Sequence, residues 1–174
     1  MRKRYLFTIL LFILTTASAY ADRIIMHNTN EILGKVTEIS DNYIKYIPYD
    51  QDLVRTIGQQ AVCSIEFENG RTEEITSKVV ILDPKRDWQN VIVVYDHTAV
   101  KGMNKVGEAT KKANSAWSTN TKKEGLEKKV FEKLKKECVK FGGEVILVIR
   151  KDSQSQGGFG SYGFAEISAE FYTY

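Results

Sequence analysis

The chain has few of the residues from which metal and catalytic sites are most often built. Its 174 residues include only two histidines, two cysteines and two prolines. His27, His97 and the cysteines do not stand at a metal-ligand spacing such as C-x-x-C or H-x-x-x-H. Neither histidine lies near an obvious nucleophile in the sequence, so a Ser-His or Cys-His mechanism would depend wholly on tertiary contacts. We therefore expect no metal, no cofactor and no enzymatic activity.

An excess of positive charge is also missing once the first residues are set apart. Residues 1–21 hold three basic and no acidic residues, and without them the chain has 22 Lys and Arg against 22 Asp and Glu. Nucleic-acid binding usually needs clustered excess Lys and Arg to displace counterions from phosphates. The balance of charge therefore argues against nucleic acid as a partner.

Residues 1–21 have the composition of a secretory signal peptide. A basic segment at Arg2–Arg4 precedes an apolar run at Leu6–Leu14 and a small-residue cleavage box at Ala19–Ala21. The apolar run is shorter than the roughly 20 residues that cross a bilayer. No cysteine follows the box, which argues against a lipid anchor. We expect cleavage before Asp22, a periplasmic or secreted protein, and no transmembrane span after cleavage.

Two parts with different hydrophobic periods follow the leader. Residues 22–82 read as five to six short strands separated by turn clusters, and 68–70 carries the Asn-Gly hairpin signal. Short strands in this number suit a small, strongly bent barrel or sandwich, and we predict a small all-β barrel, in which closure removes exposed strand edges. The polar segment 83–87 contains one of the two prolines and is the predicted linker.

Residues 88–174 predict a two-layer β-β-α-β-β domain, so the whole chain falls in the α+β class. Its helix follows a capping box at Thr121 and Glu124 and ends at Gly142–Gly143. One face of this long amphipathic helix is apolar, with Leu126, Val130, Leu134, Cys138 and Phe141. Segments 110–121 and 151–161 are expected to be loops, and the last strand alternates apolar and polar residues.

Both parts resemble domains of Gram-negative envelope proteins. The stretches 22–26, 31–39, 43–46 and 62–70 are similar to a small β-barrel module of exported proteins, with a Gly-Lys-Val strand, an Ile-x-Tyr strand and an aromatic-x-Asn-Gly hairpin. The second part resembles a group that includes exported proteins of unknown function, the proposed heavy-metal-binding domains and the stress-sensor lipoprotein of the Rcs phosphorelay. Its matching motifs are Val100-Lys-Gly102, Lys105-Val-Gly107-Glu108, Phe141-Gly142-Gly143, Glu144-Val-Ile-Leu-Val148 and Gly163-Phe-Ala165. This chain lacks the sensor's lipid anchor, its four cysteines and any metal-ligand cluster. The resemblance implies fold and compartment, and no activity.

The late glycines at 158–163 match the G-x-G-x-x-G dinucleotide pattern in letters only. That chemistry needs a helix directly after the glycines and an acidic residue about 20 positions later, whereas here a strand follows and the sequence ends at Tyr174. A hairpin loop is the better interpretation. The alternative is a contact loop that exposes Phe159 and Tyr162, since loops on rigid scaffolds often carry binding residues.

Cys63 and Cys138 leave two possibilities open. A disulfide between them would close a loop of about 75 residues and stabilise the chain by about 4 to 5 kcal/mol in the chain-entropy model. Each cysteine, however, falls on an apolar face of its own part, where free cysteine is common. We expect two separate thiols.

These observations favour a non-catalytic exported protein that acts through contacts with another envelope protein or envelope component. The alternative is a small-ligand or glycan-binding protein that uses the loop at 157–162 or a cleft between the two parts.

Overall fold

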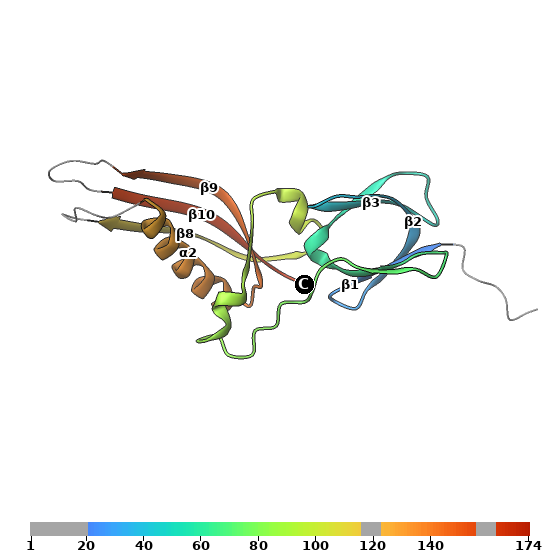
Figure 1. Cartoon of the computed structure of the whole chain (residues 1–174), viewed down its shortest axis with the longest axis horizontal. Coiled ribbons are helices and arrows are strands. Elements are labelled where there is room, and N and C mark those ends of the chain that lie inside the picture. The colour runs from blue at the N-terminus through green and yellow to red at the C-terminus, as the bar shows by residue number, and fades with distance from the viewer. Residues whose placement is uncertain (1–20, 116–122, 156–162) are drawn as a thin grey trace, which may run out of the picture.

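The computed structural model describes residues 21–115, 123–155 and 163–174, and these form two β-sheets and one α-helix (Figure 1). The predicted α+β class is therefore confirmed. In Figure 1 the sheet with β1, β2 and β3 occupies one end of an elongated molecule, and β8, β9, β10 and α2 occupy the other. The end marked C lies between them. Among the described residues, no helix has the length and apolar character needed to cross a membrane.

The first sheet has six strands in the order β4-β3-β2-β1-β5-β6, all antiparallel. Its strands are β1 Asp22–Met26, β2 Glu31–Ile39, β3 Tyr43–Pro48, β4 Arg55–Gly58, β5 Val62–Glu66 and β6 Thr72–Glu74, with the 3-10 turn η1 at Gln59–Ala61. Register shifts between Ile25 and Met26 and between Val36 and Glu38 mark irregularities that bend a sheet.

The second sheet has the order β7-β9-β10-β8. Its elements are the 3-10 turn η2 Asp87–Asn90, β7 Ile92–Val94, the 3-10 turn η3 His97–Val100, β8 Asn104–Ser115, α2 Lys123–Lys140, β9 Val145–Ser155 and β10 Gly163–Thr173. Only β7 runs parallel to its neighbour. Two loop predictions are wrong here, because β8 continues to Ser115 and β9 to Ser155. Both extensions pair with β10, and this pairing overrides the weak strand propensity of their polar residues.

Helix α2 covers one face of the second sheet. It begins at Lys123, so Thr121 of the predicted capping box lies outside the described residues. Four of the predicted face residues are fully buried: Leu126, Val130, Leu134 and Cys138. Phe141 follows the last helical residue and is 48% exposed, with its ring against Phe171, and Gly142 then turns the chain with a φ of 74°.

One hydrophobic core continues from the first sheet into the second. Buried residues of the first sheet and η1 contact buried residues of the second part in a single cluster. The first set is Ile24, Met26, Ile44, Tyr46, Ile57, Ala61, Val62 and Ile65, and the second is Val100, Met103, Val145, Leu147 and Tyr172. A second cluster fills the space between α2 and its sheet. The two sheets are therefore held together by shared apolar burial as well as by the covalent connection through 83–87.

Candidate functional site

The structure places the sequence-predicted candidates in three different settings. Phe159 and Tyr162, with the rest of the 157–162 loop, lie outside the described residues. Cys63 on β5 is half-buried and Cys138 on α2 is fully buried, and both are free thiols. Burial raises the pKa of the Cys138 thiol to about 12, so it is protonated at neutral pH. Where a cleft between the two parts was considered, apolar side chains of the shared core are in contact.

His27, which directly follows β1, is buried. It is 5% exposed, and its Nε2 lies 2.8 Å from Thr76 Oγ1. Thr76 gives its one hydroxyl hydrogen to the carbonyl oxygen of Val62 at 2.7 Å, so the network assigns His27 Nε2 as a donor. Burial and the nearby Lys78 ammonium lower the His27 pKa. His27 is thus a neutral, hydrogen-bonded part of the structure.

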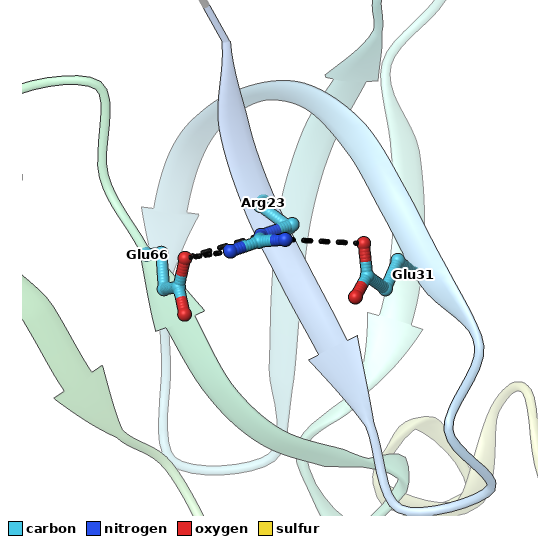
Figure 2. Close-up of polar contacts among 3 residues, drawn as sticks. All are labelled: Arg23, Glu31 and Glu66. Carbon is cyan, nitrogen blue, oxygen red and sulfur yellow. Dashed lines mark hydrogen bonds and ion pairs between the residues drawn. The ribbon is translucent and has the colours of Figure 1, made fainter. Parts of the chain in front are cut away.

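Arg23 on β1 joins the two strands that flank it (Figure 2). Its Nε and Nη2 donate to the Glu66 carboxylate on β5, with Nε at 3.1 Å, and Nη1 lies 3.5 Å from the Glu31 carboxylate on β2. Hydrogen bonding to Glu66 is the main cause of the raised Arg23 pKa. These side chains are 38–48% exposed, so water screens the pairs. Arg23 pairs with both carboxylates, and we interpret the three residues as a structural contact that joins β1 to β2 and β5.

Asp22 begins β1 and is also committed to the backbone. Its carboxylate accepts the N–H groups of Val36 at 2.8 Å and Glu68 at 3.0 Å. A hollow of about 500 Å³ lies beside it, lined also by Lys35 and Asn69. Because the Asp22 carboxylate is already hydrogen-bonded to two backbone N–H groups, this hollow is a weak candidate for a binding site.

The face of the second sheet opposite α2 is polar, and no element of the described residues covers it over much of its length. Along β10, Ala165, Ile167 and Ala169 are buried against α2. Because side chains of a strand alternate, the intervening Glu166 and Ser168 lie on the other face, where they are half-buried. Near the junction this face is covered by the shared core. From Phe164 to Glu170 it remains accessible, and we call this region the open face.

Side chains of three strands meet on the open face in matched pairs. The register places Lys112 of β8 and Asp152 of β9 on either side of Glu166, with Lys112 Nζ 2.9 Å from the Glu166 carboxylate. Ser168 is flanked in the same way by Thr110, whose hydroxyl lies 2.8 Å from its own, and by Arg150. Side chains at directly opposite positions of antiparallel strands lie in contact. The strand register therefore brings these hydrogen-bond donors and acceptors together.

Glu170 closes one end of the open face. Lys105 Nζ lies 2.7 Å from both the Glu170 and the Glu108 carboxylates, and the Tyr172 hydroxyl donates to Glu170 at 2.8 Å. These bonds lower the Glu170 pKa and raise the Lys105 pKa, while burial and Glu170 raise the Tyr172 pKa to about 12. All three groups therefore keep their protonation states around neutral pH, and the end of the face presents fixed charges.

One hollow lies on the open face and another lies around the β9 edge beside it. The first, of about 310 Å³, is lined by Glu108, Ala109, Thr110, Ile149, Ser168, Ala169 and Glu170. The second, of about 630 Å³, is lined by the open-face residues Arg150, Asp152, Gln154, Phe164 and Glu166 and, on the α2 side, by Lys123, Lys151 and Ser153. Ile149, at the register shift in β9, is 56% exposed. The surface thus combines charged pairs, hydroxyl groups and an apolar side chain on a rigid sheet.

Sequence reasoning found only part of this surface. The alternation of Glu166, Ser168 and Glu170 with apolar residues indicated a polar strand face. Of the residues that β8 and β9 add to it, Thr110, Lys112 and Asp152 fall in segments predicted as loops. These segments would have been recognised as strands only if the alternation of side chains had been extended into their polar residues.

No protein-family model, curated protein or solved structure matches this chain. Across residues 21–115, 123–155 and 163–174, no group of three or more His, Cys, Asp or Glu side chains could hold a metal ion. The geometry of the open face is therefore the basis for the functional proposal.

Proposed function

We propose that this protein is a non-catalytic, exported envelope protein that binds another protein through the open face of its second sheet. One observation carries the proposal: within residues 21–115, 123–155 and 163–174, nothing covers the β8-β10-β9 surface from Phe164 to Glu170, while α2 buries the opposite face. The sheet and α2 form two layers, and a partner protein bound to the open face would form a third.

The chemistry of the surface supports a protein partner. Protein interfaces combine a polar rim with hydrogen bonds and a few apolar contacts. The open face offers the Lys112–Glu166 pair, the Thr110–Ser168 hydroxyls and the exposed Ile149 in one continuous area. Side chains held by partners lose less conformational freedom on binding, which lowers the cost of association.

Site-specific photo-crosslinking in living cells tests this proposal. A photoreactive amino acid replaces Ser168 at the centre of the open face, and in a matched control it replaces Lys129, which is exposed on α2. We expect one discrete heavier product from position 168 and none from position 129. Equal labelling from both positions, or none from either, would overturn the proposal.

A charge reversal in the same cells adds a specificity test. Lys112→Glu places two carboxylates together where Lys112 and Glu166 now pair at 2.9 Å. We expect the crosslink at position 168 to weaken, and the double variant K112E/E166K to recover part of it. If open-face crosslinks are absent but a purified envelope glycan raises the melting temperature in a saturable way, the glycan-binding alternative takes its place.

Export is supported by residues 1–21 and by the position of β1. The first strand begins at Asp22, directly after the expected cleavage site, so removal of the leader would leave the strand whole. N-terminal sequencing of the protein from a periplasmic extract should begin at Asp22. A mature protein that retains Arg2–Arg4 would contradict the assignment to a cleaved leader.

We also infer that the six-stranded sheet is curled into the small barrel expected from the sequence. The register shifts in β1 and β2 supply the bends that curling requires. Hydrogen exchange tests this: amides of β6 that pair across a closed barrel exchange slowly, whereas those of an open edge exchange quickly.

A further inference from the structure

The two edges of the second sheet are not equivalent. On the β8 edge, Lys133 of α2 reaches over and donates from Nζ to the backbone carbonyl of Lys112 at 2.8 Å. On the other side β7 pairs with β9 only at Val145–Leu147. Among the described residues, β9 from Val148 to Ser155 has β10 on one side and no strand on the other. An edge of this kind presents backbone groups that can pair with another strand.

The side chains along this free edge are complementary to their own copy. Arg150 and Asp152 carry opposite charges and both lie on the open face, as their register with Ser168 and Glu166 shows. Within one chain they pair with each other, with Arg150 Nε and Nη2 at 2.7 and 2.6 Å from the Asp152 carboxylate. In an antiparallel pair of two β9 strands centred on Lys151, each Arg150 stands directly opposite the Asp152 of the other copy. Opposite charges at facing positions stabilise strand pairing, and like charges oppose it. A two-fold axis through Lys151 therefore lets each Arg150 pair with the Asp152 of the other copy, in exchange for its partner within the chain.

Lys151 would meet its own copy on the axis, on the side of the sheet that α2 covers. Its Nζ lies 2.7 Å from the Glu127 carboxylate of the same chain, and Ser153 donates to the other Glu127 oxygen at 2.6 Å. Glu127 thus offsets the positive charge that would otherwise repel the second Lys151. The pKa of Glu127 is lowered by these contacts, which keeps it ionised at neutral pH.

Helix α2 lies on one face of the sheet, where it shares a buried cluster with Val148 and holds Lys151 and Ser153 through Glu127. Strand β7 ends at Val94, opposite Leu147, so it stops before the proposed pairing from Ile149 to Ser153. The same register sets Ser155 of the second copy opposite Leu147, so the last two residues of each β9 must turn away from the sheet edge in the pair.

We propose that two copies of this chain associate through antiparallel pairing of their β9 strands about Lys151, which joins the two four-stranded sheets into one. This inference deepens the proposed function and rests on it, because it names a second copy as one protein that binds beside the open face. Both copies of α2 then lie on the same side of the combined sheet, and the two open faces form one larger surface.

Exchange of the two charges tests the register of this pairing. In Arg150→Asp and in Asp152→Arg, the facing positions of a homodimer carry like charges. We expect each single variant of the mature protein to dissociate at concentrations at least tenfold higher than the unmodified protein, as measured by sedimentation velocity. The double variant R150D/D152R restores opposite charges and should associate like the unmodified protein.

Mixing the two single variants gives the decisive result. The R150D chain carries a carboxylate at both positions, and the D152R chain carries a guanidinium at both. In a heterodimer each carboxylate of one chain therefore faces a guanidinium of the other, so the mixture should associate although neither variant does so alone. A change of fold within one chain cannot produce this recovery. Circular dichroism of each variant checks that the fold is kept.

Helix α2 supplies the matched control. Lys129→Glu reverses an exposed charge that belongs to neither sheet edge, and we expect it to leave the mass of the assembly unchanged. A strictly monomeric unmodified protein, or dissociation caused by K129E and not by the β9 variants, would overturn the inference. If the protein is monomeric while position 168 still crosslinks to a different protein, the proposed function stands without it. If the protein is monomeric and position 168 gives no crosslink, both proposals are rejected.

Discussion

The ring of Tyr174 packs against the imidazole of His27, with ring centroids 4.7 Å apart and planes inclined by 60°. Tyr174 directly follows β10 and His27 directly follows β1, so this contact joins the last strand of the second sheet to the first strand of the six-stranded sheet. Tyr174 also accepts the backbone N–H of Val79 at 3.2 Å through its hydroxyl. Tyr174 therefore joins the end of β10 to the residue after β1 and to the segment at Val79, beside the shared core.

Removing the Tyr174 ring should weaken the whole fold. Tyr174→Ala takes away the contacts with His27 and the Val79 acceptor, and we expect a loss of about 2 kcal/mol in the free energy of unfolding, because the ring is only partly buried. Tyr174→Phe keeps the ring and loses only the acceptor, at a cost of about 1 kcal/mol. Urea denaturation measures both. Equal midpoints for Y174A and the unmodified protein would show that the contact does not stabilise the junction.

Acid should destabilise the protein through His27. Burial and Lys78 lower its pKa below the ordinary value of 6.5, so near and below that pH the unfolded chain binds more protons than the folded chain. The free energy of unfolding then rises with pH in this range. The His27 contribution is fully present above about pH 6.5 and is lost as pH falls toward the lowered pKa.

Urea denaturation between pH 5 and pH 8 measures this slope. His27→Gln keeps an N–H donor for Thr76 but does not titrate, and we expect it to flatten the slope. His97→Gln, at the exposed histidine of η3, is the control for the loss of a histidine elsewhere in the chain. A slope that survives in H27Q would assign the pH dependence to another group.

Gly58 should tolerate no side chain. A Cβ at this position would overlap the carbonyl oxygen of Ala99 and lie 2.7 Å from the backbone nitrogen of Lys101. The Gly58 N–H also donates to the Lys101 carbonyl at 2.7 Å, so β4 and the turn after η3 approach through their backbones. We expect Gly58→Ala to lower the free energy of unfolding by about 2 to 3 kcal/mol.

Gly125 offers the opposite case within the same chain. It lies in α2, and a Cβ there would meet no atom within 4 Å. Gly125→Ala should stabilise the protein by up to about 1 kcal/mol, because alanine favours helix and restricts the unfolded chain. Thermal melts of both variants make the comparison. Similar changes in the two would contradict the close approach at Gly58.

Cys138 should not react with alkylating reagents until the protein unfolds. Its thiol is fully buried and its pKa is raised to about 12, whereas alkylating reagents attack the thiolate. Mass spectrometry after alkylation without reductant should leave Cys138 unmodified in the native protein and modify both cysteines in denaturant. Two thiols that react only after reduction would instead reveal a disulfide and a different arrangement of the junction.

Much of the local structure follows from the residue pattern. The apolar spacing of Leu126, Val130, Leu134 and Cys138 specifies an amphipathic helix, and the alternation along β10 specifies which residues face it. These signals repeat over many residues, and burial of one face is their direct physical consequence. The α+β class could be predicted because it depends only on which periods occur along the chain.

The open face and the junction depend on contacts that no local pattern contains. Lys112 faces Glu166 and Thr110 faces Ser168 only because β8 extends alongside β10, and that extension is stabilised by pairing between segments distant in the sequence. His27 is buried only because Thr76 and Tyr174 close over it. Residue types and periods along the chain therefore determined the helix and the alternation of its strands. Tertiary structure alone decided the pairing of charges, the burial of His27 and which sheet edge stays free, because register and packing are set jointly by residues far apart in the chain.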